Sequence, residues 1–100
     1  MEKDLLKIIE HFKVNNQQRK LQEEVFELQE AIIKRESIAG YEIENLNNHD
    51  KHIKEEIADV MILLEQIKLH YGISNEEITK IFWEKVNRTL ERIESEYYEK

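Results

Sequence analysis

The chain of 100 residues contains no cysteine and no proline, and it has only two glycines. Without cysteine it can form neither a disulfide nor a thiolate metal site, which suits the reducing cytoplasm, where we expect the protein to work. The shortage of turn-forming residues favours a helical bundle over a sheet protein. No apolar run has transmembrane length and the N-terminus lacks a signal-peptide pattern, so we expect no membrane partner.

Acidic residues outnumber basic ones, with 22 Asp and Glu against 15 Lys and Arg, so the formal net charge is −7 at pH 7. Affinity for nucleic acid polymers comes mainly from basic surface, so this balance argues against such a partner. It does not exclude a small phosphorylated ligand, because a bound metal ion can supply the missing positive charge. The length indicates one small domain, residues 1–100, which would gain from sharing a core with a second copy.

Apolar residues recur at helical spacing in four segments of the chain, which predicts an all-α fold. The expected helices cover about residues 4–13, 17–37, 48–71 and 75–97. Gly72 follows the third segment at the position of a C-terminal cap, and Ser74 with Glu77 forms a capping box before the fourth. The stretch 37–48 contains Gly40 and is predicted to be a connecting loop.

The second and third expected helices carry the same pattern of apolar and acidic residues, shifted by 32 positions. With 3.6 residues per turn, each helix has an apolar stripe with two acids along one flank. The two stripes are Leu21, Val25, Leu28 and Ile32, and Ile53, Ile57, Val60 and Leu64. The flanking acids are Glu24 and Glu27, and Glu56 and Asp59. If the helices pack through their stripes, the four carboxylates meet at the edge of the core.

A single pair of acids at this spacing usually forms only a solvated face. Two pairs in the same phase are more informative, because their charges repel one another unless protons or cations neutralise them. We therefore predict a divalent-cation site. Carboxylate ligands suit Mg²⁺, with Mn²⁺ as a substitute, better than zinc or copper. Glu23 and Glu55 lie beside the acidic flank, and either could act as a general base.

Basic and amide side chains provide candidate contacts for the rest of a ligand. On the fourth helix, Lys85, Arg88 and Arg92 lie on one flank, where they either form a solvated face or bind phosphate oxygens. At the start of the second helix, Gln18 and Lys20 either form an exposed first turn or contact the ligand. A second apolar face, which includes Ile33, Ile62, Trp83 and Leu90, predicts a protein partner surface.

The acidic pattern resembles the EExxE…ExxD signature of the MazG-like all-α nucleotide pyrophosphohydrolases. It is carried by Glu23-Glu24-x-x-Glu27 and Glu56-x-x-Asp59, with Lys85 and Arg88 in the last helix. The resemblance extends from about residue 17 to residue 92 and is nearest to the short, single-domain members of phages and Gram-positive bacteria. It implies a four-helix MazG-like bundle completed by oligomerisation, as a homodimer or homotetramer.

The resemblance further implies Mg²⁺-dependent hydrolysis of nucleoside triphosphates between the α and β phosphates, which yields a monophosphate and pyrophosphate. By the motif match, Glu24, Glu27, Glu56 and Asp59 hold the metal, Glu23 assists, and Lys85 and Arg88 hold phosphates. Two alternatives from the residues remain open. One is a non-catalytic helical interaction module whose acidic flank meets a basic partner, and the other is a regulator that binds nucleotide or metal without cleavage.

Overall fold

The computed structural model describes residues 1–37 and 46–98, which form four α-helices. These are α1 (Glu2–Phe12), α2 (Val14–Glu36), α3 (Leu46–His70) and α4 (Asn75–Tyr98). Within these ranges there is no β-strand, so the prediction of an all-α chain is confirmed there. Most of the predicted connecting loop lies outside the described residues. None of the described helices is both long and apolar enough to cross a membrane.

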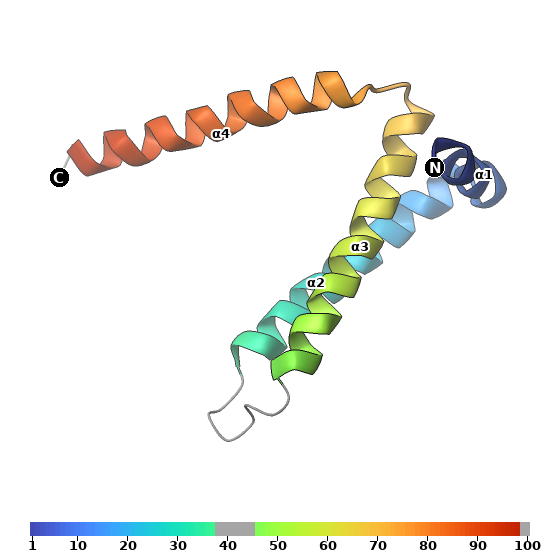
Figure 1. The fold of residues 1–100 in the computed structure, drawn as a ribbon, viewed down its shortest axis with the longest axis horizontal. Coiled ribbons are helices and arrows are strands. Elements are labelled where there is room, and N and C mark those ends of the chain that lie inside the picture. The colour runs from blue at the N-terminus through green and yellow to red at the C-terminus, as the bar shows by residue number, and fades with distance from the viewer. Residues whose placement is uncertain (38–45, 99–100) are drawn as a thin grey trace.

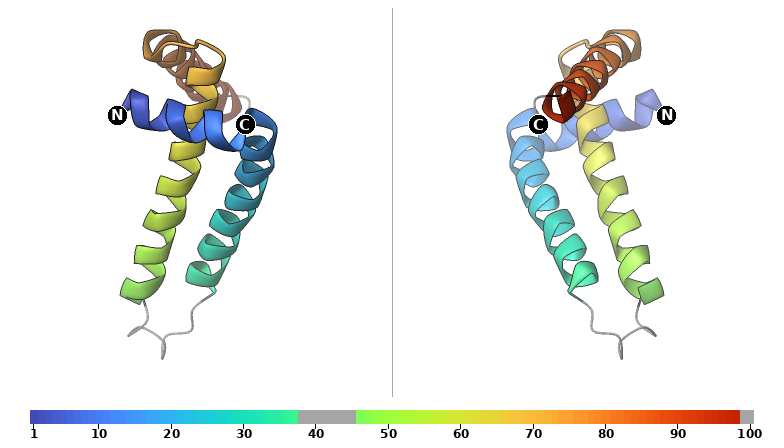
Figure 2. Two further views of the ribbon diagram at one scale, coloured as in Figure 1. Left: turned by 90° about the vertical axis from the view of Figure 1, so that its right-hand side faces the viewer. Right: turned by 90° about the vertical axis from the view of Figure 1, so that its left-hand side faces the viewer.

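The centre of the fold is an antiparallel hairpin of α2 and α3, with α1 lying across the end where α2 begins and α3 ends (Figure 1, Figure 2). A single residue, Lys13, separates α1 from α2. Its φ of 73° is in the left-handed region, while its backbone N–H still donates to the Ile9 carbonyl oxygen at 2.8 Å. This one residue ends the first helix and turns the chain, and α2 begins three residues before its expected start at residue 17.

The α2–α3 interface keeps half of the predicted stripe positions and replaces each of the others by the residue that precedes it in the chain. The positions that the two helices turn inward are Leu21, Glu24, Leu28 and Ala31, and Ile53, Glu56, Val60 and Leu63, all buried or half-buried. Val25, Ile32, Ile57 and Leu64, predicted to lie in the interface, are exposed. The small side chain of Ala31 permits close approach of the helices, and α1 packs over the end that contains Leu63.

The core of a single chain is small. Among the described residues, the buried apolar side chains are Ile9, Ala31 and Leu63. Four polar or acidic side chains are buried beside them: Gln17, Glu24, Glu56 and Gln66. Large apolar residues are exposed on α2, α3 and α4. A domain with so little buried apolar surface has a weak hydrophobic driving force for folding alone.

The end of α3 is a Schellman motif centred on Gly72. The N–H of Ile73 donates to the Lys68 carbonyl at 2.9 Å, and the N–H of Gly72 donates to the Leu69 carbonyl at 3.2 Å. Gly72 has a φ of +66°, which a residue with a Cβ adopts only at a cost. The glycine cap predicted from the sequence is therefore confirmed.

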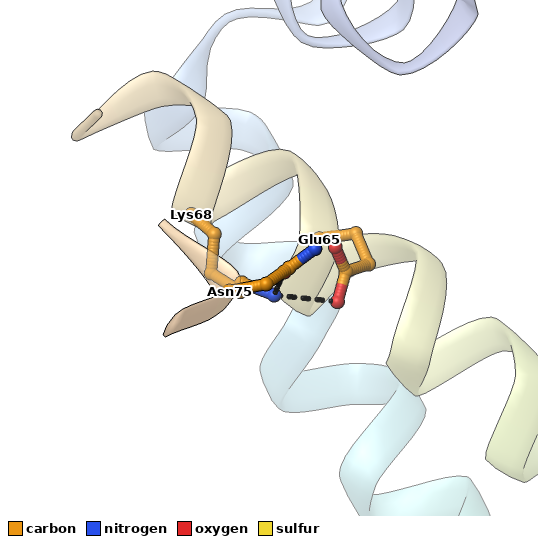
Figure 3. A network of polar contacts seen from close by, with 3 residues as sticks. All are labelled: Glu65, Lys68 and Asn75. Carbon is orange, nitrogen blue, oxygen red and sulfur yellow. Dashed lines mark hydrogen bonds and ion pairs between the residues drawn. The ribbon is translucent and has the colours of Figure 1, made fainter. Parts of the chain in front are cut away.

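From this turn α4 runs away from the hairpin (Figure 1) and packs on none of the other helices within the described residues. Beside the turn, the Lys68 ammonium donates to Glu65 at 2.9 Å and also to the Asn75 side chain, which joins the end of α3 to the start of α4 (Figure 3). The described helices of one chain thus form a three-helix unit and a separate fourth helix. A closed four-helix bundle would need a partner.

The predicted capping box before α4 is formed. The Glu77 backbone N–H donates to Ser74 Oγ at 3.1 Å, and the Ser74 N–H donates to the Glu77 carboxylate at 3.3 Å. Ser74→Ala should weaken the first turn of α4 by about 1 kcal/mol, since a lost cap leaves helix N–H groups unsatisfied. Amide hydrogen exchange across α4 measures this change. Ser95→Ala, inside the same helix, is the matched control and should leave the first turn unchanged.

Candidate metal centre between α2 and α3

Three of the predicted carboxylates converge at the middle of the hairpin. Glu24, Glu27 and Glu56 each offer a carboxylate oxygen, and these oxygens all lie within 4.8 Å of one another. Glu24 and Glu56 are only 9% and 7% exposed, because they occupy inward positions of the interface, whereas Glu27 is exposed. The two acidic motifs lie in equal phase on their helices, and their carboxylates therefore form a cluster. This cluster lies deeper in the α2–α3 interface than the edge of the core, where the sequence predicted it.

The two buried carboxylates are incompletely neutralised. One oxygen of each, Oε2 of Glu24 and Oε2 of Glu56, is buried and has no hydrogen-bond partner among the described residues. The other oxygens have one distant basic neighbour each: Lys20 Nζ lies 3.7 Å from Glu24, and His52 Nε2 lies 3.9 Å from Glu56. Because buried charge is costly without close partners, the cluster has unused capacity to bind a proton or a cation.

The electrostatics of the cluster raise the pKa of Glu56 above its ordinary value. Burial is the main cause, because it disfavours the charged carboxylate, and the adjoining carboxyl of Glu24 adds to it. The charges of Glu27 and Asp59 act in the same direction. In the absence of a cation, the folded chain therefore holds a proton at Glu56 more tightly than the unfolded chain does.

This pKa shift predicts that Glu56→Gln stabilises the metal-free protein in a pH-dependent way. Below the ordinary carboxyl pKa of 4.5, both states of the wild type are protonated at Glu56 and the substitution gains nothing from charge. As the pH rises above that value, the unfolded state loses its proton first, so wild-type stability falls relative to the variant until the raised pKa is passed. Urea unfolding with EDTA at several pH values measures the difference. Glu55→Gln, whose side chain is exposed beside Lys51, should show no such dependence.

A cavity of about 400 Å³ opens beside the carboxylates, where α1 crosses the hairpin. It combines apolar, amide, basic and acidic groups, and is lined by Ile8, Phe12, Gln17, Lys20, Glu24, Asp59, Ile62, Leu63 and Gln66. Its volume lies in the range of small-molecule sites, which are typically apolar with a few placed polar groups. Carboxylates and cavity therefore form one continuous site.

A buried amide pair lies in the wall of this cavity. Gln17 Nε2 donates to Gln66 Oε1 at 2.8 Å, and Gln66 is only 1% exposed. Within the described residues the pair makes no other hydrogen bond, which leaves the Gln17 carbonyl oxygen and the Gln66 amide group with unused capacity. Such a pair can both accept from and donate to a polar ligand.

The remaining predicted residues of the hairpin divide between this site and solvent. Asp59 lies outside the group of three converging carboxylates but lines the adjoining cavity with Glu24. Lys20 lines the cavity as well, whereas Gln18 is exposed and its neighbour Gln17 takes the place in the wall. Glu23 is exposed on α2 beside Glu27 in a shallow depression.

The predicted phosphate-binding residues lie elsewhere. Lys85, Arg88 and Arg92 are exposed on α4, which makes no packing contact with the hairpin of its own chain in the described ranges. Within one chain, therefore, the structure does not bring these cations to the carboxylates.

Sequence reasoning missed two residues of the site, His52 and Gln66. Gln17 belongs to the polar cluster of residues 17–20 that opens the second predicted helix and was expected either to be exposed or to contact the ligand. The 32-residue shift that relates Glu24 to Glu56 also relates Lys20 to His52, so the repeat contained the signal for this position. Gln66 carried no comparable signal, because an amide in a helical segment is usually exposed.

Comparison of this chain with models of protein families, with curated proteins and with solved structures finds no match.

Proposed function

We propose that this protein is a Mg²⁺-dependent nucleoside triphosphate pyrophosphohydrolase of the MazG-like kind. The observation that carries the proposal is the pair of buried carboxylate oxygens on Glu24 and Glu56 that lack hydrogen-bond partners within the described residues. With Glu27 close by, they form an all-oxygen donor set that only protons or cations can neutralise. The resemblance of the acidic motifs to the MazG-like signature implies the reaction type.

The chemistry of the donor set fits a hard divalent cation. Carboxylate oxygens are the usual ligands of Mg²⁺ and Mn²⁺, and Mg²⁺ typically completes its shell with water and substrate phosphates. Glu24, Glu27 and Glu56 would hold the ion, and Asp59 would contribute from the cavity side. When bound, Mg²⁺ neutralises phosphate charge and lowers the pKa of a coordinated water.

The proposed reaction consumes one water and breaks the P–O–P link between the α and β phosphates. The hydroxyl of the water joins the attacked phosphorus, and the bridging oxygen leaves with the other phosphoryl group. The products are a nucleoside monophosphate and pyrophosphate. Exposed Glu23, next to Glu24 in the chain and beside Glu27, is placed to accept the proton from water as general base.

The nucleoside part of the substrate would occupy the adjoining cavity. Phe12 and Ile62 provide apolar contacts there, and the Gln17–Gln66 amide pair offers a donor and an acceptor to a base edge. Lys20, between the cavity and Glu24, would contact a phosphate. The protein would act as a homodimer or homotetramer, because its own core is too small to cover its apolar residues.

A panel of ribo- and deoxyribonucleoside triphosphates with Mg²⁺, followed by anion-exchange chromatography of the products, tests the proposal. Monophosphate plus pyrophosphate from any substrate would support it, and the ranking across bases would report specificity. Diphosphate plus orthophosphate as products would agree with the proposed metal site but would contradict cleavage between the α and β phosphates. Absence of product with both Mg²⁺ and Mn²⁺ would favour a binding protein over an enzyme. The melting temperature with nucleotide or metal would then distinguish the two alternatives: a rise indicates a regulator that binds the ligand, and no rise indicates an interaction module.

A further inference from the structure

The α2–α3 hairpin has an approximate internal two-fold symmetry around its carboxylates. A shift of 32 positions relates Glu24 and Glu27 on α2 to Glu56 and Asp59 on α3. The two helices lie side by side and run antiparallel (Figure 1, Figure 2). A pattern that is repeated in equal phase on antiparallel helices places matching residues on opposite sides of the centre and on the same face of the pair. Each half of the site therefore has a counterpart in the other half.

This symmetry places one basic residue on each side of the carboxylates. Lys20 and His52 each precede the buried glutamate of their helix by four residues. Lys20 Nζ lies 3.7 Å from Glu24, and His52 Nε2 lies 3.9 Å from Glu56. At 1.5 Å per residue, four residues displace each basic group by about 6 Å along the helix axis. Because the helices are antiparallel, Lys20 lies toward α1 and His52 lies toward the opposite end of the hairpin, where α3 begins.

The cavity beside the carboxylates breaks this symmetry, because α1 crosses the hairpin only at the end where α2 begins (Figure 1). Lys20 lines the cavity together with Phe12 of α1 and the buried amides Gln17 and Gln66, whereas His52 does not line it. A nucleoside bound in this cavity must direct its phosphates away from α1. A phosphate chain that starts near Lys20 and crosses the carboxylates therefore ends on the side of His52.

The His52 side chain has unused capacity to bind a ligand that reaches this side. It is 51% exposed, and its separation of 3.9 Å from Glu56 is too long for a hydrogen bond. The imidazole makes no hydrogen bond within the described residues. An imidazole carries at least one N–H donor in either protonation state. His52 can therefore donate to a phosphate oxygen while Glu56 holds a cation.

Few other donors lie close to the carboxylates. Within the described ranges, Lys20 and His52 are the basic residues that approach the two buried glutamates, and Lys85 and Arg88 lie on α4, which does not pack on the hairpin. Phosphate oxygens that a cation leaves free are best bound by basic or N–H groups of the protein. Lys20 and His52 are thus the donors that a single chain offers to the two ends of a phosphate chain.

We propose that His52 binds the pyrophosphate part of the nucleotide, the β and γ phosphates, while Lys20 on the other side contacts the α phosphate. The nucleotide then lies along the hairpin in one direction, with its base beneath α1 and its terminal phosphate toward the start of α3. This inference rests on the proposed function, since it assigns the two products to opposite sides of the carboxylates.

Binding of inorganic pyrophosphate in the presence of Mg²⁺ tests the role of His52 without turnover. Isothermal titration calorimetry should show roughly tenfold weaker binding for His52→Ala, the change expected when one hydrogen bond to a charged group is lost. Binding of the monophosphate formed from the nucleotide that is hydrolysed fastest should be unchanged. Lys20→Ala should show the reverse pattern. Lys51→Ala removes a charge beside His52 but on the outer side of α3, and this control should bind both products as the wild type does.

The outcomes distinguish this inference from the proposed function. Unchanged pyrophosphate affinity of His52→Ala, in a protein whose wild type hydrolyses nucleotides, would overturn the inference and leave the proposed function. Equal weakening of both products would show that His52 acts through the cation site, and would also overturn it. Pyrophosphate binding that depends on His52, in a protein that hydrolyses no nucleotide, would retain the contact and reject the proposed function. A wild type that binds no pyrophosphate would overturn the inference.

Two nitroxide labels measure the direction of the bound nucleotide, because the natural chain has no cysteine to compete for the label. Asn16 and Asn48 are exposed and occupy matching positions, four residues before Lys20 and His52. The ligand is the uncleavable α,β-methylene analogue of the best substrate, with Mg²⁺. Its γ-phosphate NMR signal should be broadened more by a label on Asn48→Cys than by one on Asn16→Cys, and its base protons should show the opposite preference. The reverse result would place the terminal phosphate beneath α1 and contradict the proposal.

Discussion

Replacing Glu24 by glutamine is expected to lower kcat/KM for nucleotide hydrolysis by about a thousandfold or more, because a metal ion supplies several kcal/mol of transition-state stabilisation and each 1.36 kcal/mol is a factor of ten. Glutamine keeps the size and one oxygen of the side chain but loses the charge that holds a cation. Asp59→Asn should have a similar effect from the cavity side of the site.

The expected loss would not arise from unfolding. Removing one of several mutually repelling charges relieves the metal-free cluster, so Glu24→Gln should keep its helical circular dichroism, and its melting temperature without metal should be no lower than that of the wild type. Its melting temperature should no longer rise with Mg²⁺, since the ligand that stabilised the folded state is not bound. Glu30→Gln, an exposed position two turns along α2, is the matched control and should retain wild-type activity. Full activity of both Glu24→Gln and Asp59→Asn would show that the site is assigned wrongly.

Truncation of Leu63 is expected to have the largest effect on stability. Leu63 is 3% exposed and belongs to the small set of apolar side chains buried in the described residues. Leu63→Ala should therefore lower the free energy of unfolding by about 2–5 kcal/mol, through lost apolar burial and the cavity that remains. This is a large part of the 5–15 kcal/mol typical of a domain, so much of the variant should be unfolded at moderate temperature. Urea unfolding followed by circular dichroism measures the loss.

The neighbouring residue supplies the control for this experiment. Leu64 is 45% exposed, so Leu64→Ala should cost about 1 kcal/mol or less. The predicted stripe contained Leu64 and the structure buries Leu63, so the pair of variants tests which of the two residues α3 turns into the core. A larger loss at Leu64 than at Leu63 would support the packing predicted from the sequence and contradict the observed interface.

Local interactions are the part of this protein that its sequence determines directly. The helical segments, the glycine cap at residue 72 and the Ser74–Glu77 capping box depend on neighbours a few positions apart, and the sequence predicted each of them, although α2 begins at Val14 and α3 at Leu46, ahead of their expected starts. The convergence of Glu24, Glu27 and Glu56 was also predictable, because two motifs in equal phase on antiparallel helices must face one another.

The depth of the carboxylates and the position of α4 depended on the tertiary structure. Apolar periodicity placed Val25 and Ile57 inward, but packing around Ala31, Leu63 and α1 turned the adjacent glutamates into the interface instead. This change affects only half of the stripe positions, yet it decides which charges are buried and hence which pKa is raised. The pattern of residues also did not reveal that α4 packs on none of the other helices in the described part of the chain. The sequence alone therefore determined the helices and the acids, and the tertiary structure decided how deeply the acids lie and that the cations of α4 do not reach them within one chain.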